Sequence, residues 1–257
     1  MFVTNPDAFL VTLYLMAATF FVVALIYSSV GMGGGSSYTA LMAIFGVNIL
    51  AIPLISLILN LMVTSVGSYN FIRNNHGRFR LILPFLFSSI PMAYLGGSLE
   101  MPAHIFYWIL LISLIFVATR IYLWKSVSIS LNLSSKEKLI ISMIAGSVLG
   151  LIAGIVGIGG GIYLVPLIII LGLGSEKEAA ACGAIFIWLN SLSGLASRIQ
   201  FNEINLIEYW PLLPAVLVGG MIGSYMGSFR FSSKKIDQIL GLVVVVASVL
   251  LVKKIIF

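Results

Sequence analysis

Charged residues are rare along this chain, and long apolar stretches separate them. The stretches that contain no Asp, Glu, Lys or Arg include residues 8–72, 81–99, 105–119, 139–175, 179–197, 209–229 and 239–252. About 20 apolar residues in a helix cross the roughly 30 Å hydrocarbon core of a bilayer. Most of these stretches are long enough for one crossing, and the first can hold two. The pattern predicts an all-α, polytopic membrane helix bundle.

The composition agrees with this fold class. Hydrophobic residues make up 60% of the 257 residues and charged residues only 9%, a balance that leaves too little polar surface for a water-soluble globule. The net charge of +6 comes from basic residues in short clusters between the apolar stretches. Such clusters are typical of membrane-protein loops rather than of a nucleic-acid surface. We therefore expect a lipid bilayer as the surroundings and no nucleic-acid partner.

A glycine-rich run divides the chain into two similar halves. The pattern Val-Gly-X-Gly-Gly-Gly occupies residues 30–35 and returns at residues 156–161, an offset of 157 − 31 = 126. The same offset aligns further positions without a gap: Gly46 with Gly172, Ser65 with Ser191, and Gly97 with Gly223. Self-similarity at a fixed offset indicates a repeated structural unit. We predict a first repeat at 1–125, a linker at 126–138 and a second repeat at 139–257.

Each half contains five apolar segments, of which the second is short. The predicted segments are 8–30, 36–50, 52–72, 81–99 and 104–124, then 139–156, 162–173, 179–197, 209–228 and 236–253. Two glycine series at four-residue spacing, Gly146, Gly150 and Gly154 and then Gly219, Gly223 and Gly227, predict close helix packing.

The orientation of the halves follows from whether the short segment re-enters the membrane. If it does, each half crosses an odd number of times and the second half is inverted. Positive loop charges then collect on one side, and only Arg198, Lys253 and Lys254 of the 14 basic residues lie on the other. If the two segments that flank each glycine run instead form one broken span, the basic residues divide almost as unevenly between the two sides of the membrane. Length favours inversion, because residues 8–46 as one helix would run about 58 Å.

The two glycine runs are the strongest candidates for chemistry. Glycine permits turns and close ligand approach that a Cβ would block. A helix that starts after such a break offers unpaired amides and the positive end of its dipole, which suits an anion. The candidate residues are Gly33, Gly34, Gly35, Ser36, Gly159, Gly160 and Gly161. The alternative is a tight turn between packed helices that binds nothing.

Polar residues on the third segment of each half could complete such a site. Asn60, Thr64 and Ser65 lie within two helical turns in the first half, and Asn190 and Ser191 occur in the second. Their amide and hydroxyl groups could bind a ligand without a buried charge, or they could hydrogen-bond neighbouring helices instead. The basic residues that end these segments are further candidates for substrate contact: Arg73 and Arg198.

Other chemistry finds no support in the sequence. Cys182 is the only cysteine, which excludes an internal disulfide and a multi-cysteine metal site. Neither glycine run has the third glycine of the dinucleotide fingerprint, since Ser36 and Ile162 stand in that place. The chain also has no zinc-protease or nucleophile-elbow motif. We expect no cofactor, no metal and no enzymatic activity.

The sequence resembles the sulfite exporter TauE/SafE family, also described as toluene sulfonate uptake permeases. The resemblance rests on residues 31–35, on 157–167 (Gly-Ile-Gly-Gly-Gly-Ile-Tyr-Leu-Val-Pro-Leu) and on 73–79 (Arg-Asn-Asn-His-Gly-Arg-Phe). The first run has Ala40 where the second has Pro166. The resemblance implies transport of small, often sulfur-containing anions, such as sulfite or organosulfonates, across the bacterial inner membrane.

These observations predict a secondary transporter of a small anion, for example sulfite, thiosulfate or an organosulfonate. A proton or sodium ion is a possible coupling partner. An anion channel is the nearer alternative and a membrane scaffold subunit the more distant one. The sequence does not specify the oligomeric state or the direction of transport.

Overall fold

The computed structural model describes residues 6–29, 32–73, 79–123, 134–201, 207–229 and 233–256, and within them the regular structure is helical. The first half contains α1 (Pro6–Ser28), α2 (Gly35–Ile44), α3 (Ala51–Arg73), α4 (Phe79–Ser98) and α5 (Ala103–Leu123). The second half contains α6 (Ser135–Val156), α7 (Gly161–Ile170), α8 (Glu176–Phe201), the 3-10 turn η1 (Ile207–Tyr209), α9 (Leu212–Phe229) and α10 (Ser233–Ile256). All ten predicted segments are confirmed as helices.

The surface and the helix lengths suit a bilayer. Helices α1, α3, α4, α6 and α8 contain spans of at least 19 residues that are long and apolar enough to cross a membrane. Large apolar side chains cover the outside; Phe87, Ile112 and Val249 are 77%, 64% and 63% exposed. The predicted all-α membrane bundle is confirmed at this level.

Several helix ends differ from the predicted segments because local capping sets them. Helix α6 begins at Ser135, not 139, since the Ser134 hydroxyl accepts from Glu137 N and the Glu137 carboxylate accepts from Ser134 N. Ser175 and Glu178 start α8 in the same way. The short helices end earlier than predicted, at Ile44 and Ile170.

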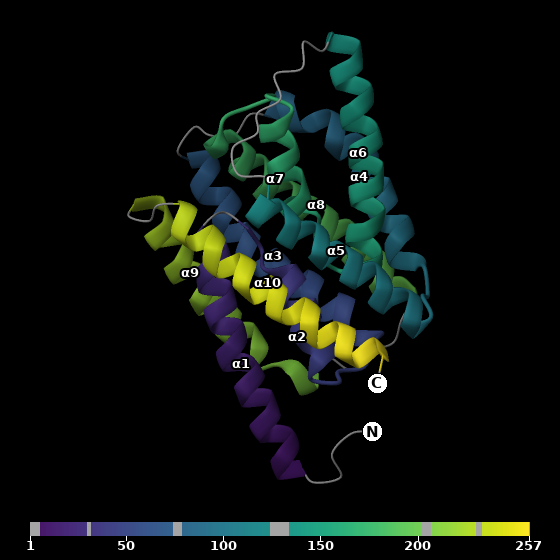
Figure 1. Cartoon of the computed structure of the whole chain (residues 1–257), viewed down its shortest axis with the longest axis vertical. Coiled ribbons are helices and arrows are strands. Elements are labelled where there is room, and N and C mark those ends of the chain that lie inside the picture. The colour runs from purple at the N-terminus through teal and green to yellow at the C-terminus, as the bar shows by residue number, and fades with distance from the viewer. Residues whose placement is uncertain are drawn as a thin grey trace.

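Two corresponding pairs of helices pack across the two halves. Helix α6 of the second half packs on α4 of the first, and α1 of the first packs on α9 of the second, as Figure 1 shows for the purple and yellow-green helices. The match extends to single residues: Gly154 lies against Gly97 N, and Gly223 lies against Ser28 Oγ. The two pairs correspond at the repeat offset, since 154 − 28 = 126 and 223 − 97 = 126.

Helices α3 and α8 cross at the centre in opposite directions. Gly194 lies beside Leu57, the Trp188 indole donates to Ser65 Oγ, and Gly67 faces Ala184. As the α3 number rises, its partner's number in α8 falls, so the pair is antiparallel. At the offset of 126, α3 and α8 are the corresponding segments of the two predicted repeats.

The glycine series forms the closest helix contacts, as predicted. A Cβ on Gly146, Gly150 or Gly154 would lie 2.2–2.5 Å from an atom of α4, and on Gly219 or Gly223 it would lie 2.0–2.4 Å from α1. A Cβ could not fit at these distances, so only glycine lets the two helix backbones approach this closely. The surroundings of Gly227 lie outside the described residues.

Gly154→Ala should therefore destabilise the protein. The new methyl would lie 2.2 Å from Ala93 O and 2.8 Å from Gly97 N, and overpacking of this kind costs about 1–3 kcal/mol. Thermal unfolding of the purified protein in detergent measures the loss. Gly67→Ala is the control, because its nearest neighbour would be Ala184 Cβ at 4.0 Å. Equal melting temperatures for Gly154→Ala and the wild type would contradict the packing argument.

Candidate functional site

Helices α2 and α7 begin at buried glycines in equivalent places. Their N-cap residues, Gly34 and Gly160, have left-handed backbones with φ of 88° and 77°, and neither helix has a side-chain cap. Positive φ is accessible to glycine without a steric penalty. The first N–H groups of each helix have no carbonyl one turn earlier in the same helix to bond. Both helix starts therefore present amides inside the protein.

A small central cavity lies at these helix starts. Its lining comprises Tyr27, Met32, Gly33, Gly34, Gly35, Ser36, Ile158, Ile162 and Ile187. All nine residues are buried. The cavity thus combines the first glycine run with Ile158 of the second run and Ile162 just after it.

Asn60 of α3 joins the two glycine runs. A Cβ on Gly33 would lie 2.6 Å from Asn60 Oδ1, and on Gly35 or Gly159 it would lie 2.4 or 3.2 Å from Asn60 Nδ2. Only glycine leaves room for the amide at the first two positions. Asn60 is 0% exposed, and its Nδ2 donates to Gly157 O at 3.2 Å. Within the described residues, no donor reaches Asn60 Oδ1.

Ser191 of α8 adds a hydroxyl on the other side of Gly159. A Cβ at Gly159 would lie 3.1 Å from Ser191 Oγ and 2.7 Å from the Ile187 side chain. Ser191 is fully buried, and its Oγ has no hydrogen-bond partner among the described residues. Buried polar atoms are usually satisfied, so Asn60 Oδ1 and Ser191 Oγ stand out as two buried atoms near the glycine runs that have no partner among the described residues.

The other candidates pack on apolar side chains or bond within their own helices, apart from Ser65, which also bonds Trp188. Gly34 packs on Tyr38, while Gly160 and Gly161 pack on Phe186 and Ile187. Thr64 and Asn190 hydrogen-bond carbonyls of their own helices, Asn60 O and Phe186 O. Ser65 is exposed and bonds Leu61 O and Trp188. Arg73 is the last residue of α3, and its side chain lies outside the described residues.

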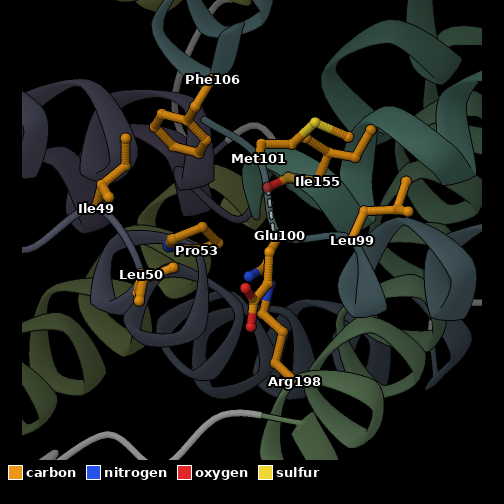
Figure 2. A pocket seen from close by; sticks show the side chains of 9 residues that line it. All are labelled: Ile49, Leu50, Pro53, Leu99, Glu100, Met101, Phe106, Ile155 and Arg198. Carbon is orange, nitrogen blue, oxygen red and sulfur yellow. Dashed lines mark hydrogen bonds between the residues drawn. The ribbon is translucent and has the colours of Figure 1, made fainter. Parts of the chain in front are cut away.

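Arg198 occupies a second pocket, at the far end of α8 (Figure 2). Its Nη2 donates to Gly154 O at 2.8 Å and to Ile155 O at 2.7 Å. The pocket is lined by Ile49, Leu50, Pro53, Leu99, Glu100, Met101, Phe106, Ile155 and Arg198. Figure 2 shows Glu100 and Arg198 among the side chains that line this pocket. Arg198 is 5% exposed and holds the last turn of α6, immediately before the second glycine run.

Four polar residues near the first glycine run were not predicted from the sequence: Tyr27, Ser37, Thr39 and Ser56. The Tyr27 hydroxyl lies 3.1 Å from Ser36 Oγ and 2.8 Å from Ser37 Oγ. Ser56 and Thr39 bond the carbonyl of Gly35. Ser56 lies one helical turn before Asn60, and Thr39 lies one turn after Gly35. This spacing was the signal that could have identified them, but both residues stand between apolar neighbours in the sequence. Among the described residues, no three His, Cys, Asp or Glu side chains lie close enough together to hold a metal ion.

The long apolar helices are those of a multi-pass membrane protein, and a buried, glycine-lined cavity lies among them. Residues 16–251 match the family described as sulfite exporter TauE/SafE, and the chain belongs to that family. It is 33% identical over 238 residues to the probable membrane transporter protein y4hK of Sinorhizobium fredii, covering 90% of this chain and 95% of the relative. It is 31% identical over 98 residues to the probable membrane transporter protein YunE of Bacillus subtilis, covering 38% and 36%. No solved structure matches the chain.

The predicted family is thus confirmed, and the protein is a membrane transporter of the TauE/SafE family. Membership in a transporter family favours transport over an enzymatic activity.

Proposed function

We propose that the protein is a secondary transporter of a small sulfur-containing anion, such as sulfite, thiosulfate or an organosulfonate, and that the anion binds in the central cavity. The observation that carries this proposal is the meeting of two uncapped helix starts, α2 and α7, around one buried cavity. Each start supplies amides and a positive dipole end. Together they can bind an anion without a lysine or arginine, which a charge-poor bundle rarely tolerates.

Asn60 and Ser191 add side-chain donors to this site. Both lie against Gly159, and Asn60 also lies against Gly33 and Gly35. Sulfite and sulfonates present several acceptor oxygens in a compact shape, which matches a ring of backbone amides with an amide and a hydroxyl. The family description supports a sulfur-containing substrate.

The halves form an inverted repeat in this proposal. The support is the antiparallel crossing of α3 and α8, which carry equivalent residues and both contain apolar spans of membrane length. Inverted repeats bring their broken helices together near the midplane of the membrane. Rocking of one half against the other would then expose the cavity to each side in turn.

A buried site favours a transporter over a channel. The residues lining the cavity are buried, including Tyr27 at 1% exposure and Ile187 at 2%. A carrier needs such a closed state between its two open ones. Both relatives come from bacteria, and we propose the bacterial inner membrane as the location.

Gly33→Ala should weaken anion binding by roughly tenfold or more, because a methyl group that overpacks the cavity displaces the groups lining it. The methyl would lie 2.6 Å from Asn60 Oδ1 and 3.2 Å from Ile187 Cγ2. Sulfite, thiosulfate, sulfonates, sulfate and carboxylates are titrated against the melting temperature of the purified protein, since a ligand of the native state raises it. Uptake into proteoliposomes gives the second readout.

Gly67→Ala is the matched control, since the added methyl meets only Ala184 Cβ at 4.0 Å. It should bind and transport the anion as the wild type does. Unchanged anion affinity in Gly33→Ala would place the binding site elsewhere. Trans-stimulated, saturable uptake by the wild type supports a carrier, and its absence would favour a channel.

A further inference from the structure

A buried group of oxygen atoms lies directly behind the first glycine run. Ser56 Oγ is 2.8 Å from Gly157 O, 3.3 Å from Gly35 O and 3.5 Å from Thr39 Oγ1. Thr39 Oγ1 also donates to Gly35 O. Ser56, Thr39 and Asn60 are each 0% exposed. We name these atoms, with Asn60 Oδ1, the oxygen cluster.

The oxygen cluster contains more acceptors than donors. Thr39 Oγ1 donates to Gly35 O, and Ser56 Oγ and Asn60 Nδ2 donate to Gly157 O. Asn60 Oδ1 accepts no hydrogen bond among the described residues. Gly157 is the C-cap of α6, so its carbonyl lies at the negative end of that helix dipole. An excess of buried oxygen lone pairs at a helix C-terminus suits a cation.

The spacing and charge of the oxygen cluster favour a monovalent cation. Ligand oxygens about 2.4 Å from one hard cation lie roughly 3 to 3.5 Å from their neighbours. Two of the three distances from Ser56 Oγ fall in that range, 3.3 Å to Gly35 O and 3.5 Å to Thr39 Oγ1. None of the five atoms belongs to a carboxylate, whereas divalent sites usually include one. Unwound carbonyls and helix C-terminal ends coordinate sodium in transporters with broken helices.

The second half does not repeat the oxygen cluster. At the offset of 126, Ser56 corresponds to Cys182, Thr39 to Val165 and Asn60 to Phe186. These three residues are also buried. The equivalent helices therefore pack without hydroxyl or amide groups at these positions. Packing alone does not explain the polar residues of the first half.

We propose that the oxygen cluster is a sodium site that couples the ion to anion transport, an inference that rests on the proposed function. Asn60 is the link between the two sites. In the structure Asn60 Nδ2 donates to Gly157 O. Sodium recruits Gly157 O and Asn60 Oδ1, and the rotated amide turns its N–H groups toward the anion cavity beside Gly33 and Gly159. One sodium ion binds per protein chain.

Melting of the purified full-length chain in sodium chloride and in choline chloride, at equal ionic strength, tests the site. Sodium should raise the wild-type melting temperature in a saturable way and should increase sulfite affinity. Thr39→Val and Ser56→Cys introduce the residues of the second half, so they should fold. Each should weaken sodium binding roughly ten- to hundredfold, because a contact to a charged group is lost. Thr19→Val is the matched control, since its hydroxyl bonds only Met16 O of its own helix.

The outcomes separate this proposal from the transporter proposal. If the wild type melts and takes up sulfite equally in sodium and choline, the sodium site is refuted while anion transport stands. The same conclusion follows if Thr39→Val and Ser56→Cys both respond to sodium as the wild type does. If sodium stabilises the wild type but not these variants and no anion binds or moves, the sodium site stands and the proposed function fails.

Discussion

Asn60→Leu should reduce anion uptake into proteoliposomes by roughly a hundredfold or more while the protein still folds. Leucine has a similar size and suits the apolar interior, but it removes the amide that touches both glycine runs. The loss of hydrogen bonds to a charged ligand accounts for this size of effect. Uptake of labelled sulfite or thiosulfate measures it, with the melting temperature as a check on folding.

The control for this change is Ser147→Ala. The Ser147 hydroxyl bonds Met143 O of its own helix and faces neither pocket. Wild-type uptake by a well-folded Asn60→Leu would mean that the amide serves only to pack α3 against the loop at Gly157. The proposed anion site would then lack the side-chain donor that we assign to Asn60.

The arrangement of helices was predictable because apolar length and glycine recurrence are local properties of the sequence. The ten segments followed from charge-free stretches, and the offset of 126 identified the equivalent elements. The helix starts at Ser135 and Glu176 were missed, although a Ser-x-x-Glu capping box precedes each. The apolar pattern alone sets the middle of a helix and leaves its ends to capping.

The site was less predictable, because it depends on which helix faces meet. The two asparagines, Asn60 and Asn190, look like counterparts, yet their numbers differ by 190 − 60 = 130, four more than the repeat offset. In the structure Asn60 lies between both glycine runs, whereas the Asn190 amide bonds its own helix. Ser56 and Thr39 drew no attention because their role depends on carbonyls contributed by Gly35 and Gly157, which are far apart in sequence.

Arg198 is the second residue with a large expected effect, and the effect is on stability first. Arg198→Met removes the donor to Gly154 O and Ile155 O, two carbonyls in the last turn of α6. Removing one partner from such a buried polar group costs about 2–4 kcal/mol. Thermal or denaturant unfolding of the purified protein measures the loss. Lys253→Met is the control, because Lys253 is exposed near the end of α10.

The anion affinity of Arg198→Met should fall as a consequence, since Arg198 holds the end of α6 just before the glycine run that lines the cavity. Arg198→Lys should recover only part of the stability, because a single ammonium group does not reproduce the planar guanidinium fork. The two roles of Arg198 are distinguishable. If Arg198→Met unfolds like the wild type but loses anion binding, the guanidinium contacts the anion directly, and the second pocket belongs to the transport path.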